Sequence, residues 1–279
     1  MADIFKYLDY RHFLRDFYRE KKEVKGSVYS FRLFSRQAGF AAPNFLQLVM
    51  EGKRNLSLDG IHRFIKGLRL NREEARFFEN LVQFNQATYD AEKTKWYQRL
   101  ATSKRYREIK KIEIDQFVYY SRWYFTAIRE LVLLPDFKED PKWIAQRVRP
   151  KITPKEAAEA LELLEGIGFL KRDKGKRLVQ TDRNITTERE VASLAIANYH
   201  RQMMERAAQS IDMTPGDKRD ISSLTVAMSR EKFIEAKRRI QEFRRELNVL
   251  LSDEGKTDSV YQINFQIFNL TEVPWPGGK

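Results

Sequence analysis

The chain of 279 residues contains no cysteine, and none of its apolar runs is long. Without cysteine it forms neither disulfides nor thiolate metal sites, which, with the polar start MADIFKYLDYRHF, favours a reducing cytoplasm. No run approaches the roughly 20 apolar residues that a membrane-spanning helix requires, and no signal peptide is visible. The sequence therefore predicts a cytoplasmic protein that makes no membrane contact.

Groups that could carry out catalysis are also sparse. The three histidines, His12, His62 and His200, fall in separate predicted helices without metal-ligand spacing, so surface or packing roles explain them. The sequence has neither a Gly-rich phosphate-binding loop nor a nucleophile elbow. We therefore expect no enzymatic activity, no metal and no cofactor.

Positive charge, by contrast, is in excess, with a formal net charge of +13 at pH 7. Residues 1–90 carry 16 basic and 11 acidic side chains, residues 91–190 carry 23 and 16, and residues 191–279 carry 13 and 12. Nearly all of the excess positive charge thus lies before residue 191. A phosphate-binding surface would belong to that part of the chain. Charge alone leaves two interpretations open, a nucleic-acid partner and a merely basic soluble surface.

Cap residues mark the helices of the first ninety residues. Apolar residues at helical spacing in YLDYRHFLRDFYREKK predict a first helix that ends near Gly26. A second should follow Ser30, a good N-cap, and end at Gly39, where helices commonly turn into the left-handed conformation. A third should begin at Pro43 and end at Gly52. Further helices are expected over residues 58–68 and after Asn71.

The second and third of these helices have the shape of a helix-turn-helix, since two short helices flank a glycine turn. In the third, three apolar side chains should face the core: Phe45, Leu48 and Val49. Three polar side chains project elsewhere at spacings of three and four residues: Asn44, Gln47 and Glu51. A basic pair, Lys53 and Arg54, follows directly.

The segment GKRNLSLDGIHRFIKGLRLN resembles the end of Cro/phage-repressor-type helix-turn-helix domains, and the resemblance covers residues 30–72. One departure is that the stretch from Gly39 to Gly52 is one residue longer than the usual pattern. Nearly the whole chain also resembles a family of predicted bacterial transcriptional regulators, in which such a domain precedes a C-terminal domain of unknown function. The matching signatures are APNFLQLVMEGKRNLS, RPKITPKEAAEALELLEGIGFLKRD and RDISSLTVAMS.

The resemblance implies that the helix from Pro43 enters the major groove of DNA. The amides of Asn44 and Gln47 would contact adenine edges, and the neighbouring basic residues would contact phosphates. The expected DNA-binding residues are thus Arg32, Arg36, Asn44, Gln47, Lys53, Arg54 and Asn55. The alternative is a small helical domain that binds another protein.

The middle of the chain predicts a second helix-turn-helix. Residues 90–113 lack Pro and Gly and should form one long linking helix with its aromatic residues inward. Residues 117–134 should form a buried helix, either of the second domain or of a dimer interface. Helices in DPKWIAQRV and after Thr153, followed by strands around KGK, then give a winged helix. Four carboxylates on the face of its second helix argue against DNA reading there: Glu156, Glu159, Glu162 and Glu165. Only the wing is basic, and an auxiliary contact stays open for Lys174, Lys176 and Arg177.

The last third should contain a helix in EVASLAIANYHRQMMERAAQSI, a strand in DISSLTVAMS, a long amphipathic helix over 230–251 and a strand in SVYQINFQIFNL. Six apolar residues should line one face of the long helix: Phe233, Ile234, Ile240, Phe243, Leu247 and Leu250. The nearly neutral surface of this part favours dimerisation or sensing of an unknown effector, although simple structural packing would also explain it.

The sequence therefore predicts a mainly α fold with an α+β C-terminal part. It divides into a helix-turn-helix DNA-binding domain (1–90), linking helices with a winged-helix-like domain (91–190) and an α+β dimerisation or sensing module (191–279). The predicted function is a homodimeric bacterial transcriptional regulator that binds double-stranded DNA sequence-specifically. Two alternatives remain, a protein-interaction scaffold with a degenerate helix-turn-helix and an RNA-binding protein, for which no RNA-binding module is visible.

Overall fold

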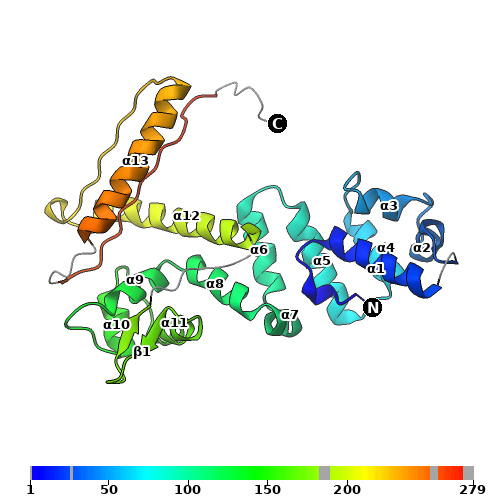
Figure 1. The fold of residues 1–279 in the computed structure, drawn as a ribbon, viewed down its shortest axis with the longest axis horizontal. Coiled ribbons are helices and arrows are strands. Elements are labelled where there is room, and N and C mark those ends of the chain that lie inside the picture. The colour runs from blue at the N-terminus through cyan, green and yellow to red at the C-terminus, as the bar shows by residue number, and fades with distance from the viewer. Residues whose placement is uncertain (1, 26–27, 182–188, 252–256, 273–279) are drawn as a thin grey trace. The chain divides into compact units, whose positions relative to one another are not determined.

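The computed structural model describes residues 2–25, 28–181, 189–251 and 257–272 (Figure 1). Thirteen α-helices and one two-stranded antiparallel sheet make up the regular structure of these residues, so the predicted mainly α fold is confirmed. Compactness divides the chain into two units: residues 1–122 with 183–199, and residues 123–182 with 200–279. This grouping differs from the three domains expected from the sequence, which stay a prediction.

The first unit consists of short helices whose ends are fixed by local hydrogen bonds. Ser30 and Ser57 cap two helices by accepting hydrogen bonds from the backbone N–H groups of Leu33 and Gly60, at 3.2 and 3.1 Å. Asn71 begins another with a reciprocal capping box to Glu74. The elements are η1 (Ile4–Lys6), α1 (Tyr10–Lys25), α2 (Phe31–Ala38), α3 (Phe45–Met50), α4 (Leu58–Leu68), α5 (Arg72–Gln86), α6 (Asp90–Leu100), α7 (Lys104–Ile109), α8 (Lys111–Ser121) and the first part of α12 (Arg189–Met213).

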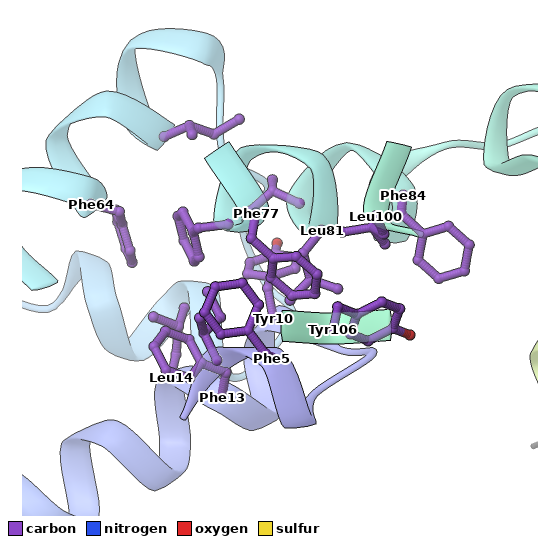
Figure 2. Close-up of a cluster of buried hydrophobic side chains, with 14 of the residues drawn as sticks. Phe5, Tyr10, Phe13, Leu14, Phe64, Phe77, Leu81, Phe84, Leu100 and Tyr106 are labelled. Carbon is purple, nitrogen blue, oxygen red and sulfur yellow. The ribbon is translucent and has the colours of Figure 1, made fainter. Parts of the chain in front are cut away.

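Aromatic side chains build the core of this unit (Figure 2). Phe77 of α5 lies between Phe5 and Tyr106, with ring centroids 4.8 and 5.0 Å away. On the other side of the core, Phe64 of α4 stacks on Phe78 at 6.4 Å. All five rings are at most 2% exposed, so the helices around them are held by extensive apolar burial.

Two amides at the end of α5 fix neighbouring segments, Asn85 at the start of α1 and Gln86 in the loop that follows α3. Asn85 accepts a hydrogen bond from the Tyr10 backbone N–H at 2.9 Å. Gln86 accepts from the backbone N–H of Leu56 at 2.7 Å and donates to the carbonyl of the same residue at 2.9 Å. Because both backbone groups of Leu56 are satisfied by one side chain, the loop between α3 and α4 has a fixed path.

The single linking helix expected over residues 90–113 is wrong. α6 ends at Leu100, and Ser103 caps a new short helix, α7, by accepting a hydrogen bond from the Tyr106 backbone N–H at 3.4 Å. The expected inward packing of the aromatic residues is confirmed for Tyr97 and Tyr106, which are buried, whereas Trp96 is half-buried against the same core. Serine is found at helix N-caps as well as inside helices. Because the segment lacks Pro and Gly, the sequence analysis missed the new helix that begins after Ser103.

The continuous helix expected over residues 117–134 is also wrong. α8 ends at Ser121, and α9 (Tyr124–Leu131) begins in the second unit. Between them, the backbone N–H of Trp123 donates to the Gln202 side chain of α12 at 3.0 Å. The Gln202 side chain thus replaces the backbone carbonyl that a continuous helix would offer to the Trp123 N–H. The apolar run in the sequence did not indicate this break.

The second unit holds the predicted helix, helix and ribbon. α10 (Pro141–Arg147) and α11 (Pro154–Gly166) precede the antiparallel strands β1 (Leu170–Arg172) and β2 (Leu178–Gln180), in which Lys171 pairs with Val179. Thr153 caps α11 as predicted, and its apolar stripe is buried: Ala157, Ala160, Leu161 and Leu164. With α9 in front, the order of elements is that of a winged helix.

The two strands expected near the C-terminus are wrong. α13 (Arg230–Leu251) is present as expected, but residues 220–229 before it and residues 259–270 after it belong to no sheet (Figure 1). Alternation of apolar and polar residues fits an extended chain, yet a strand also requires a neighbour to pair with. The short η3 (Gly216–Lys218) lies between α12 and the first extended segment.

Candidate nucleic-acid interface

The helix-turn-helix candidate is formed by α2 and α3 with residues 39–44 between them. α2 ends at Gly39, whose φ of 81° places it in the left-handed region that favours glycine. The turn is tied back to α2 because the Ser35 hydroxyl donates to the carbonyl of Pro43 at 3.2 Å. Ser35 is buried, so this hydrogen bond fixes the path of the turn.

α3 begins at Phe45, and the prediction that it starts at Pro43 is wrong. Pro43 and Asn44 form a turn, and the carbonyl of Asn44 accepts the first helical hydrogen bond, from the Leu48 N–H at 3.1 Å. Asn44 is therefore the N-cap residue, but its side chain makes no capping hydrogen bond and is exposed. Its amide is free to donate and accept elsewhere.

The buried side of α3 differs by one residue from the expected one. Leu46 and Val49 are fully buried, whereas Phe45 and Leu48 are half-buried. Phe45 stacks on Phe40 of the turn, with ring centroids 4.4 Å apart. Because the helix starts two residues later than expected, Leu46, which the sequence analysis left out, joins the core.

Gly52 lies directly after the C-cap of α3 and changes the direction of the chain. Its φ of 76° is left-handed, and its N–H donates to the Val49 carbonyl at 3.1 Å. The N–H of Lys53 donates to the Leu48 carbonyl at 2.9 Å, which completes the cap. The next three side chains are all exposed, as expected of phosphate contacts: Lys53, Arg54 and Asn55.

α1 contributes two arginines to this region that the sequence analysis missed. The Arg11 side chain donates through Nε to the Val49 carbonyl at 3.1 Å and through Nη2 to Asn55 Oδ1 at 2.7 Å. It thereby fixes the Asn55 amide and leaves the Nδ2 group to donate. Arg15 and Lys53 line a shallow recess between α1 and the end of α3. No local pattern could have found them, because 38 residues separate Arg11 from Val49.

The side chains of four of the seven predicted contact residues form no hydrogen bond or ion pair with any described residue, and all four are exposed: Arg32, Arg36, Asn44 and Arg54. Other arginines of the same unit are paired with carboxylates. Arg19 lies 2.7 Å from Asp16, and Arg63 lies 2.7 Å from Asp59. Arg32, Arg36 and Arg54 thus lack a carboxylate partner among the described residues, as do the exposed Arg69, Arg72 and Arg76 of α5 and the turn before it.

Of the other three predicted contact residues, Asn55 is held by Arg11, and Gln47 and Lys53 both contact Glu51. Its carboxylate accepts a hydrogen bond from Gln47 Nε2 at 2.8 Å and lies 2.7 Å from Lys53 Nζ. The Lys53 contact, and then the Gln47 contact, hold the pKa of Glu51 below its ordinary value, so the carboxylate is ionised at neutral pH. DNA binding through Gln47 or Lys53 would require an exchange of these contacts.

Residues 103–270 match the family model described as a domain of unknown function, DUF4423. The match covers more than half of the chain. The protein belongs to the DUF4423 family. No curated protein and no solved structure matches the chain. The matched residues begin after α6, so the α2–α3 unit precedes the DUF4423 domain, whereas α10, α11 and the two strands lie within it.

The prediction that four glutamates form one exposed face of α11 in the DUF4423 domain is wrong, because only two of them are exposed. Positions three residues apart rotate by about 60° per step around an α-helix, so the first and last of the four glutamates lie on opposite sides. Glu156 accepts a hydrogen bond from the Thr153 backbone N–H at 2.8 Å as part of the N-terminal cap. Glu165 pairs with Arg172 of β1 at 3.0 Å. Only Glu159 and Glu162 are exposed.

The wing of the DUF4423 domain exposes all three predicted basic contacts, and one of them, Arg177, has a carboxylate partner. Asp173 accepts hydrogen bonds from the backbone N–H groups of Gly175 and Arg177, at 2.8 and 2.9 Å, and so shapes the turn. These contacts, with the Arg177 backbone first, lower the pKa of Asp173. Arg177 also pairs with this carboxylate at 3.3 Å. Lys174 and Lys176 are exposed, and Lys176 takes the left-handed position with a φ of 61°.

The described residues contain no group of three or more histidines, aspartates and glutamates that could hold a metal ion. His12 is exposed and lies 3.9 Å from Asp9 of the preceding turn, and His62 and His200 are exposed as well. Among the helices that the structure describes, none is long and apolar enough to cross a membrane.

Proposed function

We propose that the protein binds double-stranded DNA sequence-specifically through α2, α3 and residues 53–55 and regulates transcription. The observation that carries this proposal is that three exposed arginines of a helix-turn-helix candidate, Arg32, Arg36 and Arg54, have no carboxylate partner among the described residues. Such cations attract phosphates, and binding releases the counterions that surround DNA.

The contact residues divide into two roles. Asn44, at the exposed start of α3, and Gln47, one helical turn later, reach base edges in the major groove, where amides pair with adenine. Phosphates are contacted by the basic residues around them, which position the protein without reading sequence. The proposed phosphate-binding set is Arg32, Arg36, Lys53, Arg54 and Asn55, and we add Arg15 because it lines the same recess as Lys53.

The surface chemistry of α2 and α3 favours DNA over a protein partner. From residue 30 to residue 57, all of which are described, no large hydrophobic side chain is exposed. Protein interfaces depend on buried aromatic and apolar anchors at their centre. A surface without an exposed aromatic or large apolar anchor is poorly suited to a protein-interaction scaffold.

A mobility-shift titration of the intact protein tests the proposal. Labelled duplex DNA, single-stranded DNA and single-stranded RNA would be compared between about 50 and 200 mM salt, over which phosphate contacts weaken strongly. We expect duplex DNA to bind tightest and its affinity to fall linearly on a log–log scale. Absence of binding at the lowest salt would favour the scaffold, and preference for RNA would favour the third interpretation.

A further inference from the structure

The C-terminal part of the chain lacks a core of its own. Met203 is the last buried residue among those described, and none of the 22 residues of α13 is buried. Of the six residues expected to line its apolar face, Phe233, Ile240 and Leu247 are only half-buried, and the other three are exposed. A helix held by tertiary packing needs a covered apolar face, and here the described residues do not supply one.

Large hydrophobic side chains are exposed along this whole part. Fourteen of them between residues 214 and 270 are more than a third exposed: Ile221, Leu224, Val226, Met228, Ile234, Phe243, Val249, Leu250, Leu251, Tyr261, Ile263, Phe265, Phe268 and Leu270. Leu224 is 85% and Phe268 is 71% exposed. Single exposed hydrophobic residues are ordinary, but monomers rarely leave so many uncovered in one segment.

Most backbone groups of the two extended segments have no hydrogen-bond partner among the described residues, although the Ile263 carbonyl accepts from Gln262 Nε2 at 3.1 Å. No backbone-to-backbone hydrogen bond joins residues 220–228 or residues 263–270 to another described residue. The second segment is held beside α13 by side chains, since Phe265 meets Phe243 edge-on at 6.1 Å. Asn264 Nδ2 also donates to the Met203 carbonyl at 3.1 Å. Extended chain with open N–H and C=O groups is ready to pair with another strand.

We propose that residues 214–251 and 257–270 form the interface between two copies of this chain, in which the extended segments pair across the copies and the fourteen side chains are buried. On the order of 70 Å² from each side chain supplies roughly 1,000 Å², and a stable dimer needs about 800 Å² from each partner. The surface therefore has the size that self-association requires.

Charge balance favours a second copy over an acidic or basic partner. Residues 214–270 carry 10 basic and 9 acidic side chains, whereas most of the chain's net charge of +13 lies before residue 191. Identical surfaces repel when they carry one sign of charge, and this part is the one where such repulsion is absent. An open groove of about 600 Å³, lined by Leu247, Val249, Ile263 and Phe265 among others, gives the partner's side chains a place to enter.

The mass of the intact protein in solution is the first test. Light scattering or analytical ultracentrifugation at micromolar concentration should give twice the chain mass of 33.2 kDa. Leu224→Asp with Phe268→Asp should shift the protein to a monomer while circular dichroism keeps its helix content. Tyr89→Asp changes an equally exposed residue (74%) of the first unit and should leave the dimer intact. A monomeric wild-type protein would overturn the proposal.

A chemical test locates the interface without disrupting it. Because the chain has no cysteine, Leu224→Cys and Tyr89→Cys each introduce one thiol at an exposed position. Maleimide should label the Leu224→Cys thiol about tenfold more slowly at micromolar concentration than after dilution, and the Tyr89→Cys thiol at one rate throughout. Equal and constant rates would place the interface elsewhere. Neither outcome bears on DNA binding, because a monomer can still bind duplex DNA through α2 and α3.

Discussion

The two helix pairs, α2–α3 and α10–α11, resemble each other in construction and differ in what they present to solvent. Each has a capped helix and a buried apolar stripe, and each is followed by a glycine in the left-handed region, Gly52 or Gly168. The first pair exposes amides and unpaired arginines. The second exposes Glu159 and Glu162, and its arginine, Arg147 of α10, pairs with Asp136. Shape alone would assign DNA to both pairs, and surface chemistry assigns it to the first.

The largest expected contrast comes from matched double substitutions in the two pairs. Asn44→Ala with Gln47→Ala should abolish preference among duplexes, because each lost base contact costs about 1–3 kcal/mol. Glu159→Ala with Glu162→Ala should leave specific binding intact or strengthen it slightly, since negative charge is removed. Competition titrations with selected and scrambled duplexes measure both. Loss of specificity in a folded Glu159/Glu162 variant would instead make α11 the reader.

Substitution of one glycine in each unit, Gly67 in α4 and Gly166 in α11, should change the stability of the protein to different extents. A Cβ on Gly67 of α4 would lie 2.8 Å from the Cβ of Ala38 on α2, a contact too close to tolerate. Gly67→Ala should therefore destabilise the first unit by about 1–3 kcal/mol. Gly166→Ala at the end of α11 meets nothing within 4 Å and should be neutral or slightly stabilising. Urea unfolding of the two variants checks the difference, and equal midpoints would contradict the close approach of α2 and α4.

The phosphate contacts can be separated from the wing by salt dependence. Lys53→Ala with Arg54→Ala should weaken binding to all duplexes alike and lower the slope of log affinity against log salt by about 1–2. Lys174→Ala with Lys176→Ala removes the same charge from the wing and should leave the slope unchanged. An unchanged slope for the first variant would remove these residues from the interface, and a lowered slope for the second would add the wing to it.

The smallest expected effect concerns Glu51. Glu51→Gln releases Lys53 from its 2.7 Å ion pair and removes a negative charge beside the phosphates, so affinity for all duplexes should rise a few-fold. Glu162→Gln on α11 is the matched control and should change nothing. Weaker binding by the Glu51→Gln variant would mean that this carboxylate accepts from a cytosine amino group and reads sequence.

Local signals predicted much of the fold. The caps at Ser30, Asn71 and Thr153 and the stop at Gly39 lie where the sequence placed them, because capping depends on residues three or four positions apart. The break at Ser103 was missed, since nothing local distinguished it from a helix interior. The C-terminal strands failed for a different reason: alternation sets the faces of an extended chain, but only a neighbouring strand makes a sheet.

The candidate site was predicted in part. All seven expected contact residues lie on α2, on α3 or in the segments next to α3, and six are exposed, with Gln47 half-buried. Arg11 and Arg15 could not be found, because their closeness to the loop after α3 arises only when α1 packs against that helix. The hydrogen bond from Gln47 to Glu51 and the ion pair between Lys53 and Glu51 were also seen only in the structure, although the three residues are close in sequence.

The most direct test of the central claim is selection of duplexes from a random DNA pool by the intact protein at moderate salt. The account predicts that the wild-type protein enriches one motif, that the Glu159/Glu162 double variant enriches the same motif, and that the Asn44/Gln47 double variant retains DNA without enriching any. Retention of all duplexes alike by the wild-type protein, or of none at low salt, would contradict sequence-specific reading by α3.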